Sequence, residues 1–292
     1  MNYEGTVYRP PLEANSFLLQ VAIGCTHNKC TYCNMYAEKC FTVESLKKIE
    51  EDLKLAKQYY KTIERIFLVD GDAFVLKTEL LKSIALMIKK YFPECKTITM
   101  YASIQNIKAK TIEELKELKE LGINDLYVGI ESGSDEVLAH VNKGHTVKEA
   151  IEQLEKLNEA NINHMSIIML GISGKGNGIE NAKATAKLLN NVKPKIIINS
   201  TLSVFEGTKL YEELQNGTFV EARELENLME EKTLIENLEL DETFFFGNHV
   251  FNSTSVSGIL GKDKESMIKK LEYSIENFDE DVFARTFKRT QL

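Results

Sequence analysis

The sequence predicts an α/β fold, a partial (β/α)6 barrel of the TIM type with a mostly helical C-terminal extension. Short apolar runs alternate with longer amphipathic stretches, a pattern typical of parallel strands joined by helices. Six such units are complete near residue 216, whereas a full eight-unit barrel typically takes about 250 residues. We therefore expect an N-terminal segment at 1–15, the partial barrel at 16–216, and an extension over the barrel mouth at 217–292.

Strands and helices are expected to alternate, with two helical segments between the fourth and fifth strands. The apolar runs predict strands at residues 16–23, 65–69, 97–101, 125–130, 164–170 and 195–202. Helices are predicted at residues 43–61, 76–91, 111–121, 134–141, 147–160 and 179–189, and from about residue 209. Asn216-Gly217 is a turn signal and marks the end of the barrel.

Composition limits the classes of function. The net charge of −8 argues against a general affinity for nucleic acid, because phosphate binding needs a basic surface. No run of about 18 apolar residues predicts a membrane span, and the first residues lack the features of a signal peptide. We expect a cytoplasmic protein, in which thiols remain reduced. Its five cysteines, an odd number, favour metal or redox chemistry over a disulfide framework.

Three cysteines follow the first predicted strand, at the end where parallel α/β folds place their sites. Cys25, Cys30 and Cys33 lie on one loop after Gly24, and glycine lets the backbone come close to a metal. Three thiolates can hold three irons of a cubane cluster and leave the fourth iron open. Buried core cysteines, and zinc held by the three cysteines with His27 or with Cys40, are the alternatives.

The spacing C-x4-C-x2-C also occurs in plant-type ferredoxins, which need a fourth, distant cysteine. Only Cys95 is available, and it precedes the third predicted strand. It is therefore expected at the opposite end of the parallel strands from the loop, which excludes this interpretation on topology.

At the cysteine loop the chain resembles the radical S-adenosylmethionine (SAM) superfamily. The resemblance rests on Cys25, Cys30 and Cys33, with Tyr32 before the last cysteine; the common spacing, C-x3-C-x2-C, is one residue shorter. It implies a [4Fe–4S] cluster whose open iron chelates the amino and carboxylate groups of SAM. One electron then cleaves a carbon–sulfur bond, and the 5′-deoxyadenosyl radical abstracts hydrogen from the substrate.

Later strand ends extend the resemblance. Asp70, Gly71 and Asp72 occupy the place of the superfamily's Gly-Gly-Glu-like motif, which implies contact with the SAM ammonium. An ordinary turn is the alternative, since Asp-Gly is a common turn pair.

Residues 128–138, at the end of the fourth predicted strand and after it, resemble a stretch of sequence shared by three groups of radical SAM enzymes. These are the methylthiotransferases, the cobalamin-dependent enzymes and the oxygen-independent coproporphyrinogen oxidases. The resemblance implies that Glu131 and Ser132 lie beside SAM, whereas Ser134 is expected to cap the next helix. Lys143 could approach the SAM carboxylate but is interpreted as a solvated lysine. Gly171 lies in a glycine-containing segment that, by resemblance, packs on adenine.

Two residues are candidate catalytic groups by position only. Tyr101 lies near a strand end, and His249 lies in the aromatic segment 244–252 of the extension. In one interpretation, this segment closes the barrel mouth and forms hydrogen bonds to a substrate. In the other, its phenylalanines plug the open barrel and His249 has a structural role. The extension lacks cysteine, which disfavours an auxiliary cluster and sulfur insertion.

The sequence thus predicts a radical SAM enzyme acting on a small organic substrate. The resemblance implies an external electron donor, flavodoxin or ferredoxin. The alternatives are a non-catalytic zinc-binding scaffold and a SAM methyltransferase that uses no radical.

Overall fold

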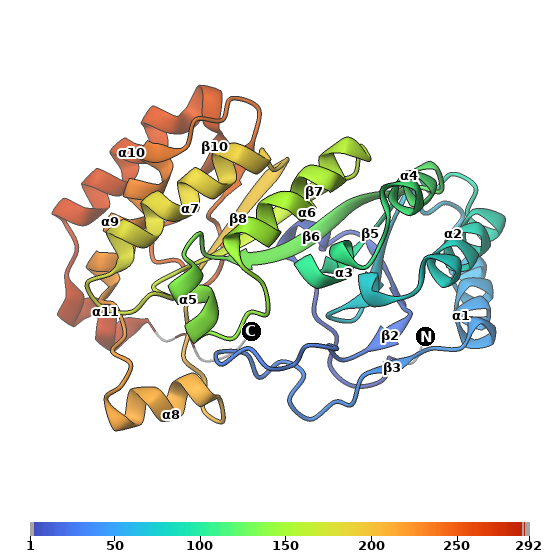
Figure 1. Cartoon of the computed structure of the whole chain (residues 1–292), viewed down its shortest axis with the longest axis horizontal. Coiled ribbons are helices and arrows are strands. Elements are labelled where there is room, and N and C mark those ends of the chain that lie inside the picture. The colour runs from blue at the N-terminus through green and yellow to red at the C-terminus, as the bar shows by residue number, and fades with distance from the viewer. Residues whose placement is uncertain (1–2, 288, 290–292) are drawn as a thin grey trace. The chain divides into compact units, whose positions relative to one another are not determined.

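The computed structural model describes residues 3–287 and residue 289 of the chain (Figure 1). These residues form two compact units. Unit 1 comprises the chain up to Asn28, Tyr36–Gly129 and Glu152–His164. Unit 2 comprises Lys29–Met35, Ile130–Ile151 and the chain from Met165 onward.

Unit 1 is built from parallel strands and their connecting helices. Its strands are β1 (Phe17–Gln20), β4 (Arg65–Val69) and β5 (Thr97–Ala102), with the short antiparallel pair β2 (Ala22–Ile23) and β3 (Thr42–Val43). Its helices are α1 (Leu46–Tyr59), α2 (Thr78–Tyr91), α3 (Ile104–Lys108) and α4 (Ile112–Glu120), with short 3-10 helices η1 (Pro11–Glu13) and η2 (Ala73–Val75). Strand β4 pairs in parallel with β1 and with β5, so that the carboxyl ends of these strands lie on one edge.

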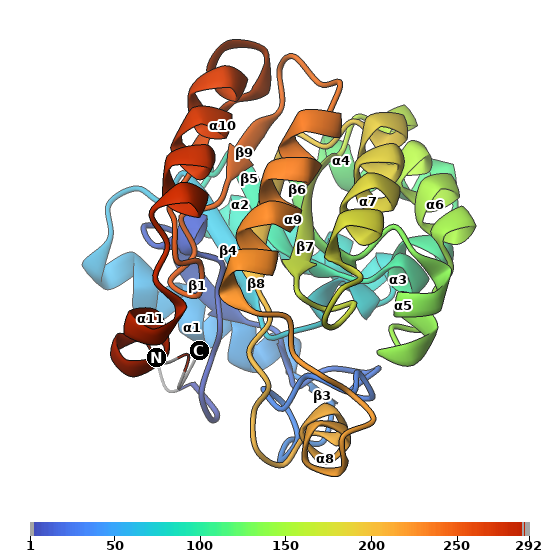
Figure 2. The ribbon, with the colours of Figure 1, turned by 90° about the vertical axis from the view of Figure 1, so that its left-hand side faces the viewer.

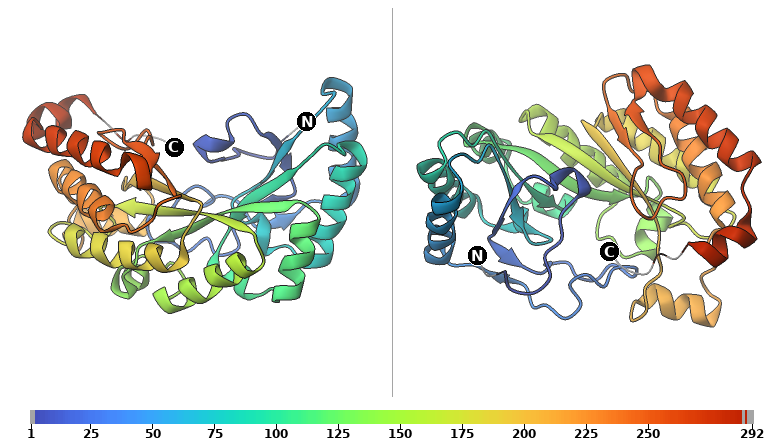
Figure 3. Two further views of the ribbon diagram at one scale, coloured as in Figure 1. Left: turned by 90° about the horizontal axis from the view of Figure 1, so that it is seen from above. Right: turned by 180° about the vertical axis from the view of Figure 1, so that it is seen from behind.

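Three elements pass from one unit into the other, namely β6 (Ile123–Glu131), α6 (Val147–Glu159) and β7 (Asn163–Leu170). The remaining elements belong to unit 2: α5 (Asp135–His140), α7 (Gly178–Val192), β8 (Ile196–Thr201), α8 (Lys209–Asn216), α9 (Glu224–Asn237), β9 (Phe244–Phe246), β10 (Ser257–Ile259), α10 (Leu260–Glu276) and α11 (Glu280–Thr286). In unit 2, α9 packs against α7 on one side and α10 on the other (Figures 2 and 3).

The predicted α/β class is confirmed, and the main sheet has two strands more than expected. The sheet has eight strands in the order β1-β4-β5-β6-β7-β8-β9-β10, all parallel to their neighbours where pairing is given except β10. Each predicted strand is found, although the run at 16–23 is divided into β1 and β2. The added strands come from the extension, because Phe244–Phe246 pairs in parallel with β8 and then with β10. Among the described residues, no helix is long and apolar enough to cross a membrane.

Helix α9 turns acidic side chains toward the protein interior. Glu231 is 1% exposed, and its carboxylate accepts a hydrogen bond from Asn199 Nδ2 on β8 at 2.8 Å. Burial raises the pKa of Glu231 to about 8, although the bond from Asn199 opposes that shift. The folded chain therefore holds a proton here at a pH where the unfolded chain has released it.

This proton predicts how Glu231→Gln changes the pH dependence of stability. Below about pH 4, the usual pKa of glutamate, the contribution of the protonated group is complete, and it is lost as the pH rises toward 8. The loss is at most about 1.4 kcal/mol per pH unit. Glutamine does not titrate and can still accept the bond from Asn199. Relative to wild type, the free energy of unfolding of Glu231→Gln should therefore rise between pH 5 and pH 8.

Urea unfolding at four pH values across this range measures the difference. The same substitution at exposed Glu239 is the control. A difference between wild type and Glu231→Gln that stays constant from pH 5 to pH 8 would contradict the prediction.

Candidate functional site

In unit 1, two buried acids hold the backbone on either side of Cys25. The Asp70 carboxylate accepts the N–H of Gly24 at 3.4 Å. The Asp72 carboxylate accepts the N–H of Thr26 at 3.2 Å and also the Thr26 hydroxyl. Both acids come directly after β4, so the end of that strand fixes the conformation in which the cysteine loop begins.

The burial of these acids is compensated within unit 1. Asp70 is fully buried, and its Oδ2 pairs with Lys39 Nζ at 2.9 Å, while Oδ1 finds no hydrogen-bond partner in the described part of the chain. Burial raises the pKa of Asp72, and its hydrogen bonds oppose the rise. Between the two acids only glycine fits, because a Cβ on Gly71 would lie 2.2 Å from the ring of Tyr36.

In unit 2, backbone hydrogen bonds hold the segment that carries Cys30 and Cys33. The N–H of Thr31 donates to the carbonyl of Val141 at 3.0 Å, just after α5. The carbonyl of Thr31 accepts the N–H of Leu210, in the first turn of α8, at 2.8 Å. The second half of the cysteine loop is thus held between the end of one helix and the start of another.

A buried ion pair belongs to the same unit. Lys143 Nζ lies 2.6 Å from Glu131 Oε1 and 3.4 Å from the hydroxyl of Tyr32, and the two charged side chains are 14% and 6% exposed. Burial alone would lower the pKa of Lys143, but the charge of Glu131, joined by those of Cys30 and Cys33, raises it. The interpretation of Lys143 as a solvated lysine is therefore wrong.

Glu131 ends β6 in an uncommon backbone conformation. Its φ of +59° is in the left-handed region, where non-glycine residues are rare. Its Oε1 is paired with Lys143, whereas Oε2 is buried and has no hydrogen-bond partner within the described residues. A buried carboxylate oxygen without a donor is costly, so this atom marks a place where a bound molecule could supply one.

The next candidate residues are held by a network in unit 2. The hydroxyl of Ser132 donates to Asn181 Oδ1 at 2.5 Å and accepts the N–H of Ser134 at 3.0 Å. The N–H of Gly171, which follows β7, donates to Glu230 Oε2 at 2.8 Å. Ser134 accepts a backbone N–H from the first turn of α5, which confirms it as the helix cap.

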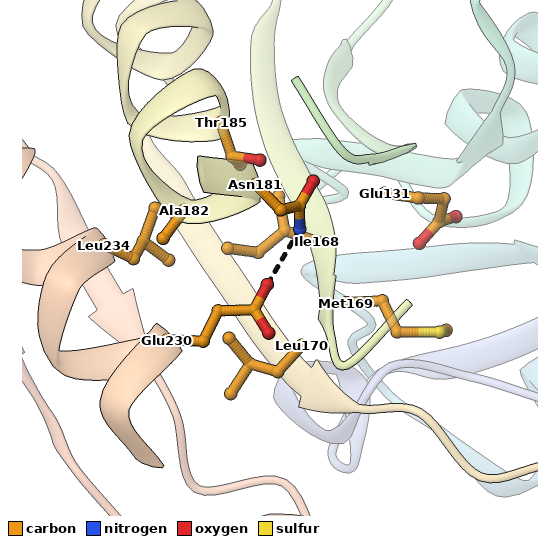
Figure 4. Close-up of a pocket in the computed structure, with 9 residues that line it drawn as sticks. All are labelled: Glu131, Ile168, Met169, Leu170, Asn181, Ala182, Thr185, Glu230 and Leu234. Atoms are coloured by element: carbon orange, nitrogen blue, oxygen red, sulfur yellow. Dashed lines mark hydrogen bonds between the residues drawn. The ribbon is translucent and has the colours of Figure 1, made fainter. Parts of the chain in front are cut away.

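A small pocket lies beside this network within unit 2 (Figure 4). Its lining combines four polar side chains with apolar ones and comprises Glu131, Ile168, Met169, Leu170, Asn181, Ala182, Thr185, Glu230 and Leu234. In Figure 4, Asn181 Nδ2 from α7 and the Glu230 carboxylate from α9 point toward each other, joined by a 2.8 Å hydrogen bond.

The two candidate catalytic residues lie in different units. Tyr101 in unit 1 packs edge to face against Phe67 and Tyr127, with ring centroids 5.2 and 6.1 Å away, and burial raises its pKa. His249 in unit 2 accepts the N–H of Phe251 at Nδ1, at 3.3 Å, which leaves the ring proton on Nε2. Burial lowers the pKa of His249, which favours the neutral ring. Their catalytic roles stay predictions.

None of the five cysteines forms a disulfide. Cys40 is exposed, whereas Cys95 is buried before β5, at the amino end of the parallel strands, and its Sγ lies 3.6 Å from the carbonyl of Thr97. Cys25 instead follows β2, which supports the exclusion of a ferredoxin site. Within residues 3–287 and 289, no three His, Cys, Asp or Glu side chains lie close enough together to hold one metal ion.

The fold and the site define an α/β protein with three thiols on the loop after its first parallel strand. The family model of the radical SAM superfamily matches residues 19–189, more than half of the chain. The chain belongs to the radical SAM superfamily. Membership assigns it the two cofactors that the sequence implied, a [4Fe–4S] cluster and SAM.

Curated relatives are similar over part of their length. The heme chaperone HemW of Bacillus subtilis is 28% identical over 152 residues, which cover 50% of this chain and 40% of HemW. The uncharacterized methyltransferase PH0819 of Pyrococcus horikoshii is 25% identical over 191 residues, 65% of this chain and 40% of PH0819. The matched region thus spans 40% of the length of either relative.

Solved structures share the fold. Methylornithine synthase (PylB) superposes with a TM-score of 0.56 at 12% identity, covering 93% of this chain and 85% of PylB. The radical SAM methyltransferase TsrM from Kitasatospora setae, solved with cobalamin and a [4Fe–4S] cluster, has a TM-score of 0.56 at 16% identity, covering 69% of this chain and 39% of TsrM. At these identities the likeness shows the fold alone.

The donor types present within each unit suit the two cofactors. Thiolates are the usual ligands of iron–sulfur clusters, and Cys25, Cys30 and Cys33 are not engaged in disulfides. The ammonium and ribose hydroxyls of SAM are donors of the kind that Glu131 Oε2 and Asp70 Oδ1 lack within the described chain.

Sequence reasoning missed two residues, one in each unit, that bind candidate site residues. Lys39 pairs with Asp70, and Glu230 binds the backbone of Gly171. Lys39 lies six residues after Cys33, and a charge so near the loop was a usable signal. The sequence offered no comparable signal for Glu230. Acidic residues occur along most of α9, and their order in the sequence does not show which of them face inward.

The buried ion pair predicts a large loss of stability for Lys143→Met. This variant leaves the Glu131 carboxylate buried without its cation, which should cost about 3–5 kcal/mol of unfolding free energy. The double variant Lys143→Met/Glu131→Leu removes both charges and should recover most of that loss. Urea unfolding of the protein without added iron or SAM measures both.

Lys183→Met is the control, since Lys183 is half exposed and its pair with Glu180 is worth less than about 1 kcal/mol. Equal losses in the single and the double variant would show that Lys143 and Glu131 are not energetically coupled.

Proposed function

We propose that this chain is a radical SAM enzyme that reductively cleaves SAM and abstracts hydrogen from a small organic substrate. One electron breaks the C5′–S bond of SAM and yields methionine and a 5′-deoxyadenosyl radical. Hydrogen transfer from the substrate then gives 5′-deoxyadenosine and a substrate radical. The observation that carries the proposal is the loop of three cysteines, supported at both ends, in a member of this superfamily.

Cys25, Cys30 and Cys33 are the proposed cluster ligands. When bound, the cluster supplies the electron chemistry, while the chain supplies binding and orientation. Asp70 and Asp72 set the backbone around Cys25 through the N–H groups of its two neighbours. In unit 2, the backbone hydrogen bonds of Thr31 set the conformation of the segment that carries Cys30 and Cys33.

The proposed SAM contacts begin with two carboxylate oxygens that have no hydrogen-bond partner in the described chain. Glu131 Oε2 and Asp70 Oδ1 are buried acceptors without partners in the described chain, suited to the ammonium or a ribose hydroxyl. Lys143 is a buried cation suited to the SAM carboxylate. The polar ends of β6 and β7, at Ser132 and Gly171, complete the proposed contacts, with Gly71 and Asp72 on the side of unit 1.

The substrate and the electron come from outside the chain. His249 carries its ring proton on Nε2, and we propose it as a hydrogen-bond donor to the substrate, with Tyr101 as a candidate hydrogen donor. The proposed reductant is an external electron carrier, flavodoxin or ferredoxin. Neither a nucleic acid nor a membrane is proposed as a partner.

A second candidate function is that of a heme chaperone. It is favoured by the similarity to the heme chaperones HemW of Bacillus subtilis and of Buchnera aphidicola. The similarity covers about half of this chain. A haem titration followed by absorbance distinguishes the two, because haem binding with no SAM cleavage would favour this candidate.

The cysteine loop predicts that Cys30→Ala abolishes SAM cleavage. The protein is reconstituted anaerobically with iron and sulfide, then given dithionite and SAM, and 5′-deoxyadenosine is quantified. Wild type should release it and Cys30→Ala should not, because a lost thiolate leaves the cluster short of a ligand. Cys40→Ala is the matched control, since Cys40 is an exposed cysteine seven residues after Cys33, and it should behave as wild type.

Other products would overturn the proposal in distinct ways. S-adenosylhomocysteine in place of 5′-deoxyadenosine would indicate a methyltransferase that uses no radical. A wild-type protein that takes up zinc but no iron and leaves SAM intact would indicate a zinc-binding scaffold.

A further inference from the structure

One buried carboxylate of α9 connects two of the strand ends assigned above to SAM, and the inference drawn from it rests on that proposed site. Glu230 Oε2 accepts the N–H of Gly171 at 2.8 Å, and Oε1 accepts Asn181 Nδ2 at 2.8 Å. Asn181 Oδ1 in turn accepts the hydroxyl of Ser132 at 2.5 Å. Glu230 therefore links the residue after β7 to the residue after β6 through a single side chain of α7, and Figure 4 shows its hydrogen bond to that side chain, Asn181.

The two linked segments are packed too tightly against the helices for their backbones to shift freely. A Cβ on Gly171 would lie 2.7 Å from Asn227 Oδ1 of α9. A Cβ on Gly133 would lie 2.3 Å from the carbonyl oxygen of Ala184 of α7. Gly171 also has a φ of +74°, a conformation that glycine adopts without strain. The hydrogen bonds of Glu230 thus act on segments with little room for another arrangement.

The acid at this position carries a cost of burial as well as two hydrogen bonds. Glu230 is buried, and burial raises its pKa to about 7, which reflects the cost of holding the charged form away from water. An apolar side chain of similar volume would avoid that cost, but it would leave the N–H of Gly171 and Asn181 Nδ2 without an acceptor. What an apolar side chain cannot do is accept two N–H groups and so fix their directions.

We propose that Glu230 is a positioning residue for SAM. Its carboxylate orients the backbone of Gly171 and, through Asn181, the hydroxyl of Ser132, so that the ends of β6 and β7 are preset before SAM binds. Preorganisation of this kind lowers the cost of ordering the site on binding.

The test compares Glu230→Met with Glu231→Met. Glu231 is a matched control, because it is the next residue on α9, equally buried, and binds Asn199 of β8 instead of the SAM segments. Each carboxylate also lies against a glycine, Gly178 for Glu230 and Gly247 for Glu231. Equilibrium dialysis of the iron- and sulfide-reconstituted proteins gives the Kd for SAM, and thermal unfolding and iron content are measured on the same samples.

Glu230→Met should raise the Kd for SAM about tenfold, the effect of losing one to two well-made hydrogen bonds, with iron content as in wild type. Glu231→Met should leave the Kd unchanged while shifting the unfolding temperature. A Kd that is unchanged in Glu230→Met, or raised equally in both variants, would overturn the positioning role.

Two further variants keep the test decisive if Glu230→Met does not fold. In Glu230→Gln, the new amide can accept the N–H of Gly171 and donate to Asn181, provided that the Asn181 amide turns over and donates to the Ser132 hydroxyl. Its Kd should therefore stay close to that of wild type. Asn181→Leu breaks the link to Ser132 alone and should raise the Kd, and an unchanged Kd there would overturn the link.

Failure of the positioning role and failure of the proposed function give different results. If reconstituted wild type binds no SAM, the proposed function is wrong, and the role of Glu230 falls with it. If wild type binds SAM and the two α9 variants bind it equally well, only the role of Glu230 is wrong.

Discussion

A carboxylate that is buried away from water must be given donors, and this requirement governs how the strand ends of the chain are built. Asp70, Asp72, Glu131 and Glu230 are all buried, and each lies at or against the carboxyl end of a strand. Each takes its donors from the backbone, the cations or the polar side chains of its own unit. The acids thereby hold the loops against the strand ends and leave single atoms, such as Glu131 Oε2, without a donor in the described chain.

The strands were predictable because short runs of apolar residues in the local sequence indicate buried strands. β4 is a continuous apolar run, RIFLV, as expected of a parallel strand covered on both faces, and it is found with the predicted bounds. β9 was missed because its three phenylalanines are too few to show a period, and what makes them a strand is pairing with β8, about 48 residues earlier. The cysteine loop was predictable for the same reason as β4, since its spacing is local.

The partners of the buried acids could not be predicted in this way. Lys39 and Asp70 are 31 residues apart, and Gly171 and Glu230 are 59 apart, so both contacts depend on tertiary packing. The residues proposed to touch SAM were thus found from local motifs, whereas those that position them come from distant helices and loops. Lys143 belongs to both groups. The sequence singled it out because it lies near the Glu131 motif. Its burial, however, depends on the turn after α5 and on its pairing with the Glu131 carboxylate.

The same lysine bears on the chemistry of the thiols. Burial raises the pKa of Cys30, and the charge of Lys143 opposes that rise, while Glu131 adds to it. One buried ammonium therefore offsets the charge of a carboxylate and favours the thiolate that an iron ligand must become. An apolar pair in place of Lys143 and Glu131 should keep most of the stability, but it would remove the cation whose charge lowers the pKa of Cys30. The ion pair therefore bears on Cys30, a proposed cluster ligand, as well as on the stability of the fold.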